Sequence, residues 1–121
     1  MIDAIREECA RTGQAQPQNI GQIMQCIYMS LARCYHHGIQ QLESLTGKKY
    51  TSINIVGGGC QDQYLNALTA RATGLRVHAG PVEGTAIGNL VVQMVSYGDL
   101  NNIETARNII RESFPVTVAN S

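Results

Sequence analysis

The sequence predicts an α/β fold that is rich in helices and contains a short parallel sheet. The first observation is a strand-like, helix-like, strand-like succession over residues 51–56, 61–73 and 75–79. The second is a helical period of apolar residues over residues 19–46. The third is the length, because 121 residues suffice for one hydrophobic core and are too few for two. We therefore expect residues 1–121 to form a single unit.

The N-terminal part of the chain predicts two helices. Residues 2–12 have a short amphipathic pattern, and a connector rich in glutamine follows. In the second helix, Asn19 and Gln22 resemble a capping box at the start, and Gly47 favours a left-handed end. Its apolar positions recur three or four residues apart, at Ile20, Ile23, Met24, Ile27, Leu31, Cys34, Tyr35, Leu42 and Leu45. At 1.5 Å per residue this helix would be about 40 Å long, so it needs a large surface to lie against.

The middle of the chain predicts two strands joined by a helix. The first strand is apolar and β-branched, the second alternates apolar with polar residues, and Gly74 ends the helix between them. A crossover of this length makes the strands parallel and the connection right-handed. Gly57, Gly58 and Gly59 would then lie at the carboxyl edge of the sheet, where open α/β sheets bind ligands.

The C-terminal part predicts two further helices and a tail. Residues 83–97 form the first helix, in which Gly84 and Gly88 indicate a face that something approaches closely. Its predicted buried residues are Ile87, Leu90, Val91 and Met94. A last helix spans residues 103–113, and residues 114–121 are expected to be a flexible tail.

The composition excludes several classes of partner. Nine basic and nine acidic residues give a formal net charge of zero, so no broad field would attract nucleic acid or an anionic membrane. No apolar run approaches the roughly 20 residues of a membrane span. Residues 1–8 carry charges where a signal peptide would be apolar. We therefore expect a cytoplasmic protein without nucleic-acid or membrane partners.

The cysteines and histidines predict no metal site. The four cysteines are widely spaced and form no C-x-x-C pair, which argues against zinc and against a disulfide framework. His36 and His37 are neighbours, and a helix would splay them about 100° apart, whereas a metal pair needs two residues on one face. Reduced, packed thiols are the expectation.

The glycine cluster matches neither of two common phosphate-binding patterns. A P-loop requires Lys and then Ser or Thr after its last glycine, and here Cys60 and Gln61 follow. In the dinucleotide fingerprint, Asp62 would occupy the third glycine position. Two interpretations remain open. One is a ligand on bare backbone beside a helix N-terminus, with Gln61, Asp62 and Gln63 available for hydrogen bonds; the other is a tight turn without a ligand.

Several motifs together resemble the C-terminal end of the FGGY carbohydrate kinases. They are GGGCQDQYLN from Gly57, TA from Thr69, TG from Thr73, AGPVE from Ala79 and TAIGN from Thr85, with TGQ from Thr12 and LESLTG from Leu42. The resemblance covers nearly the whole chain. It implies the ribonuclease-H-like fold of actin-like ATPases, with sugar and ATP in a cleft between two domains. This chain would be the C-terminal portion of the second domain.

The resemblance also implies roles for individual residues. Gly57, Gly58 and Gly59 belong to the adenosine motif, in which Gly58 and Gly59 would provide a backbone platform. Gln63 falls where relatives often place an amide near the adenine. Residues 83–89 would form a helix start packed behind that site. These residues would make the chain a half-site for ATP or ADP.

Two positions depart from the family pattern. Arg71 stands where the family usually has Asp, late in its helix, and indicates a change of surface or docking rather than a lost ligand. Gly84 stands where the family usually has Ala, which weakens its helix by up to about 1 kcal/mol.

The family's catalytic parts have no counterpart in this chain. The phosphate-binding loop, most of the sugar site and the catalytic Asp belong to stretches that nothing here matches, so no catalytic residue and no ligand for Mg²⁺ is expected. The chain alone would be inactive. The alternative is a degenerate free-standing module for oligomerisation or protein interaction, in which the glycines form only a turn. Because upstream strands are missing, we expect the isolated chain to be a homodimer or larger.

Overall fold

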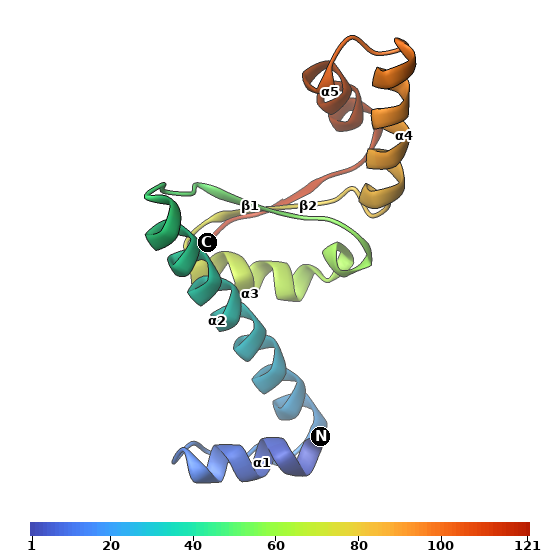
Figure 1. Ribbon diagram of the computed structural model, residues 1–121. Coiled ribbons are helices and arrows are strands. Elements are labelled where there is room, and N and C mark those ends of the chain that lie inside the picture. Colours follow the sequence, from blue (N-terminus) through green and yellow to red (C-terminus); the bar gives the residue numbers. More distant parts are fainter.

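The chain forms five α-helices, one short 3-10 turn and a three-stranded sheet in the computed structural model, which describes residues 1–121 (Figure 1). In chain order the elements are α1 (Ile2–Arg11), α2 (Ile20–Thr46), β1 (Ser52–Ile55), η1 (Gly58–Gln61), α3 (Gln63–Thr73), β2 (Arg76–Ala79), α4 (Gly84–Tyr97), α5 (Ile103–Ser113) and β3 (Thr117–Ala119). α3 lies below the sheet and is crossed by α2, whereas α4 and α5 lie on the other side (Figure 1). Every predicted helix and both predicted strands are present.

The helix ends follow local capping signals. The Asn19 side chain accepts a hydrogen bond of 2.9 Å from the backbone N–H of Gln22 at the start of α2. The Gln22 side chain in turn accepts from the N–H of Gln18, so the return bond of the capping box reaches one residue further out than expected. Gly47 and Gly74 end α2 and α3 in the left-handed conformation, with φ of 67° and 69°. Glycine adopts this conformation without the steric cost of a Cβ atom.

The sheet is mixed, which corrects two expectations. β1 and β2 are parallel, with Ile53 opposite Val77, as the helical crossover predicted. β3 then pairs antiparallel with β2, with Val118 opposite His78, so the sheet is not purely parallel. The expectation of a flexible tail over residues 114–121 is therefore wrong for β3. β-Branched residues in β3 favour an extended strand, and the free edge of β2 offers it hydrogen bonds.

The two glycines of α4 have different environments. A Cβ atom on Gly84 would lie 2.9 Å from Cβ of Val56, so this glycine allows the start of α4 to approach the end of β1. A Cβ atom on Gly88 would meet nothing within 4 Å. The expected close approach therefore occurs at Gly84 and not at Gly88. Leu90 is 58% exposed although its spacing predicted burial, whereas Ile87 is buried.

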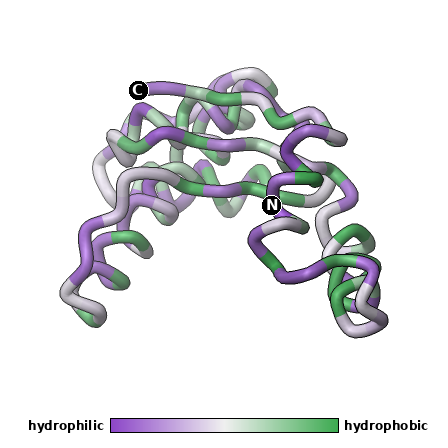
Figure 2. The backbone as a smooth tube through the Cα atoms, turned by 90° about the horizontal axis from the view of Figure 1, so that it is seen from above, coloured by the Kyte–Doolittle hydropathy of each residue, from purple (hydrophilic) through white to green (hydrophobic).

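The core is small and lies where α2, α3 and the sheet meet. Only 12 of 121 residues are buried, so much of the predicted apolar surface of α2 has no partner within the chain. Ile23 and Ala32 of α2 are buried, but Leu42 and Leu45 are exposed. None of the five helices combines the length and the apolar character that a membrane span requires. Figure 2 shows hydrophobic stretches interrupted by hydrophilic residues throughout.

Candidate functional site

The glycine turn connects the carboxyl end of β1 to the start of α3. Gly57 has φ of 85° and ψ of −177°, a conformation that strongly favours glycine. Its N–H points to the carbonyl oxygen of Pro81 at 3.4 Å, which ties the turn to the loop between β2 and α4. η1 follows and is closed by hydrogen bonds from Cys60 N to Gly57 O at 3.1 Å and from Asp62 N to Gly59 O at 3.3 Å. Gly57 thus has a conformational reason to be glycine.

Gly58 and Gly59 have no such reason inside the chain. Neither has a positive φ, and a Cβ atom on either would meet nothing within 4 Å. Both residues are exposed. The tight turn accounts for one glycine of three, and the other two leave bare backbone facing open space.

Asp62 caps the start of α3. Its Oδ1 accepts a hydrogen bond of 3.0 Å from the N–H of Leu65, and its Oδ2 accepts one of 2.6 Å from the hydroxyl of Tyr28. The Tyr28 hydroxyl, followed by the Leu65 N–H, lowers the pKa of Asp62, because both donors favour the ionised carboxylate. The same contact raises the pKa of Tyr28. Asp62 therefore has a structural role beside the turn, and each of its oxygens retains one lone pair.

A buried asparagine supports the turn from within α3. Asn66 is 3% exposed, and its Nδ2 donates a hydrogen bond of 2.9 Å to the carbonyl oxygen of Cys60. Its Oδ1 is buried and has no hydrogen-bond partner. Sequence reasoning gave no role to this residue, because nothing in the local pattern shows that α3 folds back over the turn.

Two tyrosines connect α2 to the start of α3. The ring centroids of Tyr28 and Tyr64 are 5.7 Å apart, with the ring planes tilted by 45°. The Tyr64 hydroxyl also donates a hydrogen bond to the side chain of Gln25. Together with the Tyr28–Asp62 hydrogen bond, these contacts fix α2 beside the glycine turn.

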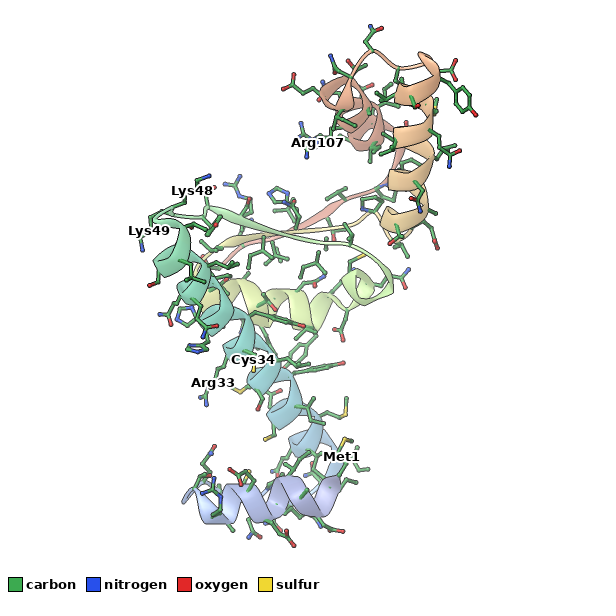
Figure 3. All side chains as sticks on the ribbon, in the orientation of Figure 1. Met1, Arg33, Cys34, Lys48, Lys49 and Arg107 are labelled. Atoms are coloured by element: carbon green, nitrogen blue, oxygen red, sulfur yellow. The ribbon has the colours of Figure 1, made fainter.

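The predicted site residues form an exposed platform rather than a closed pocket. Gly57, Gly58 and Gly59 lie together on one turn, and the exposed Gln63 begins α3 immediately after it. The main cavities lie elsewhere and are lined by other residues. One of about 720 Å³ lies between the sheet and α5 and is lined in part by His78 and Arg107, the latter labelled on α5 in Figure 3.

A second cavity, of about 630 Å³, lies between α2 and β1. Its lining is mostly apolar and includes Tyr35, Leu42 and Val56.

No group of three or more histidine, cysteine, aspartate or glutamate side chains could hold a metal ion, and all four cysteines are free thiols. The chemistry open to the glycine turn is binding of a polar or anionic ligand by backbone N–H groups at the start of a helix.

Comparison with known proteins identifies the family. The C-terminal domain of the FGGY family of carbohydrate kinases matches residues 2–97, which include α1 to α4 and the glycine turn. The chain belongs to the FGGY family. The resemblance seen in the sequence motifs is thereby confirmed, and the helix-rich α/β architecture is consistent with this C-terminal domain.

The FGGY chain also has curated relatives that it matches almost from end to end. The rhamnulokinase of Halalkalibacterium halodurans is 42% identical over 116 residues, which is 96% of this chain and 25% of the relative. The rhamnulokinase of Bacillus subtilis is 42% identical over 118 residues, 98% of this chain and 24% of the relative. That of Enterococcus faecalis is 41% identical over 120 residues, again 98% and 24%. The FGGY chain therefore spans about a quarter of the length of these relatives.

Proposed function

We propose that the chain is the nucleotide half-site of an ATP-dependent carbohydrate kinase. In this proposal the adenosine of ATP or ADP lies on the backbone of Gly57, Gly58 and Gly59, and the Gln63 amide lies beside the adenine. The observation that carries the proposal is that Gly58 and Gly59 are glycines with open space above them. Bare backbone allows a flat ligand to approach closely, and N–H groups at a helix start favour polar or anionic ligands.

The whole kinase would supply what this chain lacks. Phosphoryl transfer needs a base for the sugar hydroxyl and a metal ion on the triphosphate. We assign Asp62 neither purpose, because its carboxylate caps α3 and bonds the hydroxyl of Tyr28. The Mg²⁺ ion that phosphoryl transfer uses would therefore be held outside this chain, and the chain alone would be inactive.

The names of the relatives suggest the substrate. The three relatives are named rhamnulokinase, so L-rhamnulose is the proposed sugar of the full-length enzyme. We also propose that this enzyme acts in the cytoplasm. The three-stranded sheet would then be one part of a larger ribonuclease-H-like sheet.

Titration with ADP tests the half-site. We expect the backbone amide resonances of residues 57–63 to shift in a nitrogen-15 NMR spectrum as ADP is added. Gly59→Val should abolish the shifts, because its branched side chain would fill space that is open in the free chain. Gly38→Val is the matched control: a Cβ atom there also meets nothing within 4 Å, and the position lies on α2. Shifts that survive Gly59→Val would exclude this placement of the nucleotide.

A second candidate function is an oligomerisation module in which the glycines form only a turn. The observation that favours it is the exposed apolar surface of α2 next to the unpaired edge of β1. Such surfaces commonly mark sites of association. This function is supported if ADP leaves residues 57–63 unshifted while the chain sediments as a dimer.

A further inference from the structure

The shape of the glycine turn is held by few contacts of its own. Gly58 and Gly59 have no side chains, and a Cβ atom on either would touch nothing. The two backbone hydrogen bonds that close the turn are 3.1 and 3.3 Å long. Because glycine has the largest conformational freedom of any residue, such a segment samples many shapes unless something outside it fixes one.

Asn66 is the side chain that supplies this constraint. Its Nδ2 donates to the carbonyl oxygen of Cys60 at 2.9 Å, while the N–H of Cys60 donates to the carbonyl oxygen of Gly57. The peptide groups on both sides of Cys60 are therefore bonded. Asn66 is itself fixed, because it is buried in α3 and its own N–H donates to the carbonyl oxygen of Asp62 at 3.0 Å.

The unpaired Oδ1 of Asn66 indicates that stability alone does not explain this residue. A buried acceptor without a partner is unfavourable, and an unsatisfied group of this kind calls for an explanation. A leucine of nearly the same shape would remove the unsatisfied Oδ1 from the site. It would also lose the donor that holds Cys60.

We propose that Asn66 is a positioning residue that fixes the glycine turn in the shape that receives the nucleotide. The proposal rests on the nucleotide half-site described above. Asn66 does not touch the ligand, because its side chain is buried; it acts through the carbonyl group of Cys60 and hence through the peptide planes that lead into Gly58 and Gly59.

Two substitutions separate positioning from stability. Asn66→Leu removes the unpaired acceptor, which favours folding, and the donor to Cys60, which opposes it, so the two effects on the thermal unfolding midpoint should largely offset each other. We expect ADP binding to weaken by roughly fivefold to tenfold, the equivalent of one hydrogen bond. Asn66→Gln keeps an amide donor but adds a methylene to a packed site, so it should lower the midpoint and retain more of the ADP affinity. If Asn66 acted only through stability, the variant with the lower unfolding midpoint would also bind ADP more weakly.

Thr69→Val is the matched control. Thr69 is fully buried one turn further along α3, and its hydroxyl donates only to the carbonyl oxygen of Leu65. Its replacement should leave ADP affinity unchanged. The positioning role is overturned if Asn66→Leu binds ADP as tightly as the unmodified chain, or if Thr69→Val weakens binding equally.

Amide hydrogen exchange of the free chain distinguishes this inference from the proposed function. Asn66→Leu should speed exchange at Cys60 and Asp62, whose N–H groups close the turn, without any nucleotide present. If the unmodified chain shows no ADP shifts, the half-site is excluded together with the binding role of Asn66. If hydrogen exchange at Cys60 and Asp62 is unchanged in Asn66→Leu, Asn66 does not fix the turn, whether or not ADP binds.

Discussion

At the scale of single residues, Asp62 joins three parts of the candidate site through one carboxylate. It caps α3, bonds the hydroxyl of Tyr28 on α2, and directly follows the glycine turn. Both donors favour the ionised form, which is why its pKa lies below the ordinary value. Ionisation of this one group therefore contributes to holding α2 and α3 together.

The lowered pKa of Asp62 predicts acid sensitivity. A depressed folded-state pKa gives stability that is fully present above the unfolded-state value, about 3.9, and is lost as pH falls through the folded-state value. Tyr28→Phe removes the largest cause, so the pKa of Asp62 should rise toward its ordinary value. The stability lost on acidification should then be smaller, and the loss should be complete at a higher pH. Carboxyl carbon chemical shifts measured against pH report the change directly.

Tyr64→Phe is the control for that titration. It removes the hydroxyl that bonds Gln25 and leaves both side-chain hydrogen bonds of Asp62 in place. The titration of Asp62 should match that of the unmodified chain. An identical Asp62 titration in Tyr28→Phe would show that the hydroxyl does not lower this pKa.

At the scale of elements, α4 depends on how closely its first residue approaches the end of β1. Gly84 leaves no room for a Cβ atom beside Val56, whereas Gly88, one turn later, faces open space. In this chain the glycine sets the distance between α4 and the sheet.

This difference predicts opposite effects of the same substitution. Gly84→Ala should lower the free energy of unfolding by about 1–3 kcal/mol, because the new methyl group meets the β-branched Val56 at 2.9 Å. Gly88→Ala should raise it by about 0.5–1 kcal/mol, because alanine favours a helix and nothing obstructs it. Urea unfolding of the two variants measures both values. Equal changes in the two would contradict the close approach at Gly84.

At the scale of the whole molecule, the chain exposes an apolar surface beside a free sheet edge. β1 is an edge strand, and beside it α2 and β1 line an apolar cavity of about 630 Å³. The chain spans about a quarter of the length of these relatives.

Self-association is the expected consequence for the isolated chain. We expect sedimentation at micromolar concentration to show a dimer or larger species, and Leu42→Lys to shift it toward monomer by placing a charge in the cavity beside β1. Val92→Lys is the control, since Val92 is 58% exposed and Leu42 is 51% exposed, but Val92 lies on α4. A monomeric unmodified chain would contradict the expectation.

The sequence by itself determined the elements and the family. Helix periodicity, the Asn19 cap and the left-handed Gly47 and Gly74 are local signals that act within one turn, and they placed all five helices and the two parallel strands. The motif from Gly57 onward carried the family resemblance, because residues that share a turn are also adjacent in sequence. Gly57, Gly58, Gly59 and Gln63 could therefore be proposed as a site without knowledge of the fold.

Only the tertiary structure decided which residues support that turn and which surfaces remain open. The Tyr28–Asp62 hydrogen bond joins residues 34 positions apart, and β3 pairs with the much earlier strand β2, for example Val118 with His78. Such contacts depend on chain reversal and sheet packing, which no local pattern encodes. The same holds for the hydrogen bond that Asn66 donates to Cys60. The sequence of a helix does not show whether an asparagine in it is buried or solvated, because burial depends on the elements that pack around it.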